Sequence, residues 1–179
     1  MTDSELEGLR YPIGRVDPRP RLSVDDRRAL RDIIADTPSQ MRAAVAGLDR
    51  DQLDTPYRPD GWTVRQVTHH VPDSHMNAFI RFKLALTEDA PTIKPYDEGA
   101  WARLPDALHD DIETSLNLLE AVHTRWLRVI DGMADTDFQR ELTHPEIGRI
   151  TLDTLLQIYA WHGPHHVSHV RGLRERRGW

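Results

Sequence analysis

The chain contains no cysteine, and this absence excludes several kinds of chemistry at once. Without thiols the protein can form no disulfide, no thiolate zinc site and no iron–sulfur cluster, and it has no cysteine nucleophile. Any reaction that involves a thiol would need one supplied from outside the chain.

Long apolar runs and an excess of positive charge are also missing. No stretch of about 18 apolar residues occurs, so we expect no membrane span. The polar first residues MTDSELEGLR lack the apolar segment of a signal peptide, which favours a cytoplasmic protein. The formal net charge of −6 argues against a general nucleic-acid-binding surface. The basic residues 171–179 are interpreted as the cationic end of a helix, so we expect neither nucleic acid nor membrane as a partner.

A chain of 179 residues is long enough to bury one core, and we expect a single domain over residues 1–179. Apolar residues recur at helical spacing in several segments, whereas no segment shows a strong strand pattern. The spacing predicts an all-α four-helix bundle. The expected helices cover 24–36 and 38–48 (one helix if Pro38 only kinks it), 64–87, 111–131 and 151–176. Residues 1–22 are expected to form an extended arm, and 49–61 and 88–107 are expected to be loops.

Ten histidines stand out in this composition, and seven of them lie in residues 69–75 and 162–169. With cysteine absent, histidine is the obvious metal ligand that remains. His162 and His166 are four residues apart on the apolar face of the last helix, where two imidazoles can chelate one cation. His70 flanks the apolar stripe of the 64–87 helix and can supply a third ligand. Three imidazoles leave a position open for substrate, as in catalytic sites.

Other interpretations of the histidines stay open. The pair His162 and His166 can be hydrogen-bonded core histidines instead of ligands. Gly163, Pro164 and His165 separate the pair, so the glutamate of an HExxH metalloprotease is missing and that class is excluded. The remaining predictions are that His75 packs in the core, His123 lies at the surface near Glu120, His144 is a turn residue, and His69, His165 and His169 are surface groups or donors that orient ligands.

A polar row beside the apolar stripe predicts the wall of a half-buried pocket. The row starts at His70 and continues through residues spaced along one flank of the helix. Arginine side chains suit a carboxylate-bearing substrate because the guanidinium can bind it with two donors. The predicted substrate-binding residues are Arg65, Ser74, Asn77, Arg81 and Tyr96. Candidates for a general base are Asp73, which points away from the stripe of an ideal helix, and Asp97 and Glu98 in the 88–107 loop, and none of the three stands out.

Several segments together resemble the YfiT-like members of the DinB/YfiT family. The resemblance rests on Tyr11-Pro12-Ile13-Gly14, on LDTPYRPDGWTVRQVTHHVPDSHMNAFIRFKLALTE (53–88), on Pro95-Tyr96-Asp97-Glu98 and on LLQIYAWHGPHHVSH (155–169). It spans nearly the whole chain.

This resemblance implies a four-helix bundle, a homodimer and a three-histidine site for a divalent metal, zinc first and nickel second. The ligands that it implies are His70, His162 and His166, the same three that the helical spacing suggests. Pro72 and Pro164 depart from the family pattern two residues after proposed ligands. Proline removes a backbone donor inside a helix, so we expect local kinks there.

The resemblance implies two reactions at one site. In the first, which we rank higher, the metal activates a bacillithiol-type thiol for transfer to a small electrophile. In the second, a hydrolase uses metal-activated water. A third interpretation is a non-catalytic metal-binding stress protein, which an open three-histidine site disfavours because structural zinc is usually four-coordinate.

Overall fold

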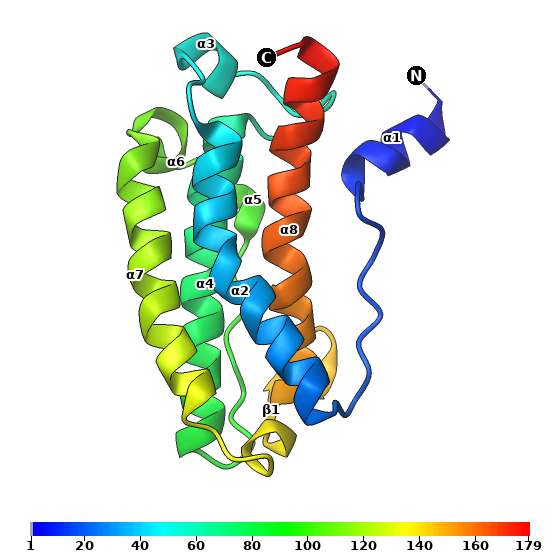
Figure 1. Cartoon of the computed structure of the whole chain (residues 1–179), viewed down its shortest axis with the longest axis vertical. Coiled ribbons are helices and arrows are strands. Elements are labelled where there is room, and N and C mark those ends of the chain that lie inside the picture. Colours follow the sequence, from blue (N-terminus) through cyan, green and yellow to red (C-terminus); the bar gives the residue numbers. More distant parts are fainter. Residues whose placement is uncertain (1) are drawn as a thin grey trace.

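Four long helices form the bundle that the sequence predicts, in a computed structural model that describes residues 2–179 (Figure 1). Three begin at the predicted caps Ser23, Thr63 and Thr151, whose side chains accept a hydrogen bond from a backbone N–H in the first turn. The helices are α2 (Val24–Val45), α4 (Val64–Thr87), α7 (Ile112–Asp131) and α8 (Leu152–Arg177).

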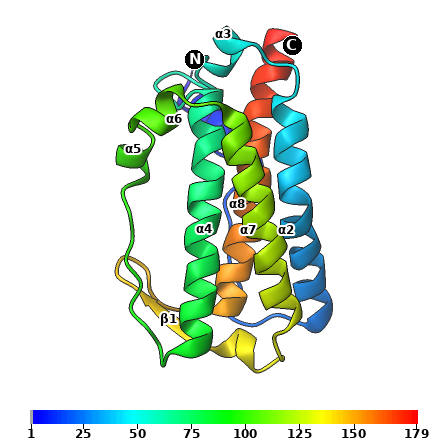
Figure 2. The same ribbon diagram turned by 90° about the vertical axis from the view of Figure 1, so that its left-hand side faces the viewer.

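The bundle pairs parallel helices as neighbours. Helices α2 and α8 run in one direction and α4 and α7 in the other, as their colour gradients show (Figures 1 and 2). Helix α2 packs against α8 and α7, and α4 packs against the same two helices. The pairs α2 and α4, and α7 and α8, therefore lie on the diagonals of the bundle, whereas α4 and α7 are parallel neighbours and need a long crossover between them.

Short elements fill the segments expected to be irregular. The arm is not wholly extended, because α1 (Asp3–Arg10) forms there with a capping box between Thr2 and Glu5. This helix buries none of its own residues, which is why no apolar period marks it. The expected loops contain α3 (Arg50–Leu53), α5 (Glu98–Trp101) and α6 (Pro105–His109). A 3-10 turn η1 (Asp137–Gln139) precedes the antiparallel strands β1 (Glu141–His144) and β2 (Gly148–Thr151).

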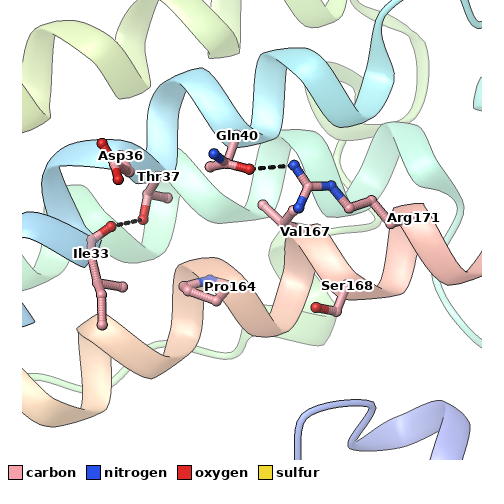
Figure 3. Close-up of a pocket in the computed structure, with 8 residues that line it drawn as sticks. All are labelled: Ile33, Asp36, Thr37, Gln40, Pro164, Val167, Ser168 and Arg171. Atoms are coloured by element: carbon pink, nitrogen blue, oxygen red, sulfur yellow. Dashed lines mark hydrogen bonds between the residues drawn. The ribbon is translucent and has the colours of Figure 1, made fainter.

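Three prolines lie inside long helices without ending them. Pro38 leaves α2 as one helix, and Pro72 and Pro164 lie within α4 and α8. At Gly163, α8 comes so near α2 that an added Cβ would lie 2.5 Å from Thr37 Oγ1. A pocket of about 220 Å³ opens between the two helices there, lined by Pro164 and Thr37 among others (Figure 3).

The core consists of two apolar clusters separated by polar side chains. One cluster contains Phe82, Trp126 and Leu156, and the other contains Val67, Leu119 and Val170. Along α4, α7 and α8 the residues between the two clusters include His75, His123 and His162. A histidine layer therefore crosses the middle of the bundle. Among residues 2–179, no helix is long and apolar enough to span a membrane.

Candidate metal centre

The structure brings His70, His162 and His166 together, as the sequence predicts. One ring nitrogen from each lies within 4.8 Å of the others, and Nε2 of His70 is 3.3 Å from Nε2 of His162. Two nitrogens bound at ~2.0–2.1 Å to one tetrahedral zinc lie roughly 3.3 Å apart. The spacing and the all-imidazole donor set therefore fit a divalent transition metal.

The three imidazoles are held in the form that binds metal. Burial lowers the pKa of His70 to about 4 and lowers the pKa values of His162 and His166 well below the usual value. Charges on neighbouring histidines lower the last two further. All three rings are therefore neutral near pH 7, and no proton has to leave a ligand nitrogen before a cation binds.

His75 is buried in the core as predicted, but the prediction for His123 is wrong. His123 is 1 % exposed, and its ring stacks on that of His75 rather than reaching Glu120 at the surface. Its two nitrogens contact the carbonyl oxygen of Ile34 on α2 and the ring of His75 on α4. The sequence of α7 alone does not predict these contacts because both partners come from other helices.

His165 and His169 of α8, predicted to be surface groups or donors that orient ligands, are both buried, and His169 contacts the proposed ligand His166. His169 contacts the carbonyl oxygen of Arg10 at the end of α1, and its ring stacks on Tyr57 with centroids 4.0 Å apart. His165 stacks on Trp161 at 4.1 Å. The arm therefore covers a face of α8 that the periodicity of α8 alone leaves exposed.

His69, predicted to be a surface group or a donor that orients a ligand, is also buried. It is 5 % exposed, and its Nδ1 lies 2.7 Å from Ser115 Oγ of α7. Its partner is thus a neighbouring helix rather than a proposed ligand.

A cleft that the sequence reasoning missed opens beside His166. Its volume is about 370 Å³, and Trp62 and His169 line it together with His166. Two guanidinium groups, from Arg10 and Arg58, give it positive charge, and Asp60 adds one carboxylate. The residues come from the arm, the segment before α4 and α8, so no single motif marks this cleft.

Three of the predicted substrate residues gather on another side of the histidines. Arg81 donates to the Tyr159 hydroxyl at 3.3 Å, and the Tyr159 ring lies 5.8 Å from that of His162. Ser74 is near the hydroxyls of both Tyr159 and Tyr96, and burial raises the pKa of each phenol. The Tyr96 hydroxyl is buried and has no hydrogen-bond partner among the described residues. A polar group of a substrate could pair with it.

The other two predicted substrate residues are engaged elsewhere. Arg65 is paired with Asp54 at 2.7 Å and donates to the carbonyl oxygen of Asp110. Asn77 donates to the carbonyl oxygen of Asp73 within its own helix. Their hydrogen bonds hold loops and helix α4 rather than extending the polar group around Tyr159.

Among the candidate bases, Asp73 has the most unusual environment. It is half-buried, and burial together with the nearby charge of Asp106 raises its pKa to about 6. Asp97 is exposed and caps α5 by accepting from the N–H of Ala100, and Glu98 is exposed in the first turn of α5. A carboxyl group that titrates near pH 6 is suited to proton transfer.

Comparisons with known proteins agree with this geometry. The family model described as "DinB superfamily" matches residues 33–170. A protein of Bacillus cereus named "Putative metal-dependent hydrolase" is 46 % identical over 174 residues, which cover 97 % of this chain and 100 % of the relative. A protein of Bacillus mycoides with a similar name is 45 % identical over the same shares.

A solved structure has the same fold. YfiT from Bacillus subtilis, described as "a probable metal-dependent hydrolase with an unusual four-helix bundle topology", superposes with a TM-score of 0.94. It is 44 % identical, and the match covers 96 % of this chain and 99 % of that one.

Proposed function

The chain belongs to the DinB superfamily, and from this membership we propose that it is a metal-dependent enzyme whose cation is held by His70, His162 and His166. The reaction that we propose first is the transfer of a small thiol of the bacillithiol type to a small electrophile. The observation that carries the proposal is the convergence of three neutral imidazoles, of which His70 and His166 are buried and His162 is half-buried, with an open cleft beside His166.

The chain's own residues hold, orient and shield the reacting groups. Trp62 packs against His70 with ring centroids 4.7 Å apart and covers that side of the site. When bound, a divalent cation would lower the pKa of the molecule that fills its free position, a thiol in the first reaction and a water molecule in the second. Zinc is the metal that we propose first and nickel the second, since imidazole ligands suit both.

The surroundings of the three imidazoles favour thiol transfer. No carboxylate is among the hydrogen-bond partners of His70, His162 and His166 in the described part of the chain. A thiol deprotonated by a cation has less need of a further base than hydrolysis, in which a proton of the attacking water must also be passed on. Arg10 and Arg58 in the adjoining cleft would pair with the carboxylates of an anionic thiol. The sulfur would then form a C–S bond as a halide leaves or an epoxide opens.

Hydrolysis is the second candidate because of Asp73. Its pKa of about 6 would let its carboxylate accept a proton from attacking water near neutral pH. The names of the relatives point to the same reaction. Ester or amide cleavage would use the same three histidines, so the two reactions differ in the substrate rather than in the site.

We also propose that the protein acts on small molecules as a homodimer and binds neither nucleic acid nor membrane. The net charge of −6 supports the absence of a nucleic-acid partner. Sedimentation of the metal-loaded protein tests the dimer, which predicts twice the mass of the chain.

The direct test measures metal content and then thiol consumption. The purified protein is analysed for bound metals, loaded with zinc or nickel, and mixed with bacillithiol and monochlorobimane. We expect thiol consumption that requires the metal and disappears in His162→Ala. The matched control is His109→Ala, which removes an exposed histidine of α6.

Two results would overturn parts of the proposal. Bound metal with cleavage of activated esters but without thiol consumption would replace transfer by hydrolysis. A protein that binds no metal after reloading would refute the metal site itself.

A further inference from the structure

Hydrogen bonds inside the bundle connect the proposed ligand His162 to a backbone carbonyl on α2. The Nδ1 of His123 lies 2.8 Å from the carbonyl oxygen of Ile34, and its Nε2 lies 2.8 Å from Nδ1 of His75. The Nε2 of His75 is in turn 3.1 Å from Nδ1 of His162. The three imidazoles thus form one line that ends at the ligand cluster.

The carbonyl at the start of this line determines where every proton lies. A carbonyl oxygen can only accept, so His123 must donate through Nδ1, and its Nε2 is left with a lone pair. His75 must then donate through Nδ1 to that lone pair, and His162 must donate through its own Nδ1 to His75. The Nε2 of His162 is thereby left without a proton, and this is the atom that lies 3.3 Å from Nε2 of His70.

A shorter line reaches the second proposed ligand on α8. The Nε2 of His169 lies 3.0 Å from the carbonyl oxygen of Arg10, and its Nδ1 lies 3.4 Å from Nδ1 of His166. By the same reasoning His169 donates through Nε2, and His166 donates through Nδ1. The Nε2 of His166 is again left bare.

We infer that these two lines are tautomer-fixing relays: His75, His123 and His169 are positioning residues that keep a proton on Nδ1, and a lone pair on Nε2, of His162 and His166. The inference rests on the proposed metal site for its purpose, whereas the tautomers themselves are a property of the metal-free chain. Metal-bound histidines usually donate their other ring N–H to a neighbour, which fixes ring orientation and increases basicity. Here the neighbours are other imidazoles.

The relay also favours one of two possible metal sites. Ring nitrogens of His165, His166 and His169 lie within 4.8 Å of one another and could hold a cation of their own. A cation on Nδ1 of both His166 and His169 would require a lone pair on each. The relay places a proton on His166 Nδ1 that a cation there would have to displace, so we expect one cation per chain.

The first test reads the tautomers in the metal-free protein, with no variant required. Long-range ¹H–¹⁵N spectra distinguish Nδ1–H from Nε2–H imidazoles. We expect His162, His166, His75 and His123 as Nδ1–H forms and His169 as the Nε2–H form. Spectra with His162 or His166 protonated on Nε2 would overturn the inference even if the protein binds metal.

The second test breaks the longer relay at the position farthest from the ligands. His123→Phe removes the acceptor of His75, so part of the His162 population should move its proton to Nε2. We expect zinc affinity, measured by competition with a chromophoric chelator, to fall about 10–100-fold. His123→Gln, whose amide can both donate and accept, should recover most of the affinity and the Nδ1–H signal of His162.

A matched control separates this effect from loss of a buried ring. His69→Phe also replaces a buried histidine, but its Nδ1 contacts Ser115 outside both relays. Equal affinity losses in His69→Phe and His123→Phe would refute the positioning role. If the protein shows the expected tautomers but binds no zinc, the proposed metal site is refuted. The relay would then fix the tautomers without preparing ligands for a metal.

Discussion

A histidine binds a cation only when its imidazole is neutral and its free nitrogen faces the metal, and burial provides the first condition here. His70, His162 and His166 all have pKa values lowered by burial. We therefore expect bound metal to be retained well below pH 6.5, the usual pKa of histidine. Contacts from other helices supply the second condition.

The raised pKa of Asp73 leads to a prediction about the reaction. Its pKa is raised to about 6, so its carboxyl group is ionised above that pH and protonated below it. If it accepts a proton during hydrolysis, kcat/KM for an activated ester should rise as pH increases through about 6. Asp73→Asn should abolish this rising limb and lower the rate at neutral pH by about 10²–10⁴-fold.

The control for this prediction is Asp97→Asn, which changes an exposed carboxylate that caps α5. It should leave the limb near pH 6 in place. A wild-type profile that persists in Asp73→Asn would remove Asp73 as the base.

Sequence spacing identifies the residues of the candidate site better than it identifies their environment. The i,i+4 spacing of His162 and His166 and the flank position of His70 predict the cluster that the structure shows. The burial of His123 and His169 is not predictable in this way. Their partners, Ile34 and Arg10, lie 89 and 159 residues away in the chain.

At the scale of single elements, Gly163 allows α8 to approach α2. Alanine is ordinarily better than glycine in a helix by ~1 kcal/mol. Here an added Cβ would lie 2.5 Å from Thr37, whose hydroxyl is already bonded to the carbonyl oxygen of Ile33 (Figure 3). We therefore predict that Gly163→Ala lowers the free energy of unfolding by about 1–3 kcal/mol in urea titrations.

The control is Gly8→Ala in α1, where an added Cβ would have no neighbour within 4 Å. This substitution should leave stability unchanged or slightly increased. A Gly163→Ala protein as stable as the wild type would mean that α2 and α8 can separate at no cost.

Helix caps and apolar periods predict the long elements because both signals lie within the element itself. Ser23, Thr63 and Thr151 mark three helix starts correctly. The short helices α1, α3 and α5 have caps but no apolar period, because Leu53 of α3 is their one buried residue, and the sequence therefore does not predict them. The effect of Pro72 on α4 is also not predictable from these signals. The helix continues past Pro72 because packing against neighbouring helices outweighs the lost backbone hydrogen bond.

At the scale of the whole molecule, the histidine layer makes folding sensitive to acid. Burial lowers the pKa of His123 to about 4, whereas the unfolded chain takes up this proton near pH 6.5. Its contribution to stability is therefore complete above pH 6.5 and is lost as pH falls towards 4. Metal-free protein should show a free energy of unfolding that decreases across this range.

The variant His123→Phe measures how much the protonation of His123 contributes to this loss of stability in acid. Removing the group should reduce the slope of unfolding free energy against pH by up to about 1.4 kcal/mol per pH unit between pH 6.5 and 4. Urea titrations of both proteins with a chelator present measure the two slopes. Parallel slopes would show that His123 takes up its proton equally in the folded and unfolded states.

Counting bound metal shows whether His70, His162 and His166 hold one cation at the middle of the bundle. Elemental analysis of the zinc-loaded protein after gel filtration gives the number of cations per chain. We predict about one for the wild type and for His109→Ala, and close to none for His162→Ala, since two imidazoles bind far more weakly than three. A His162→Ala protein that still carries one cation per chain would contradict this prediction.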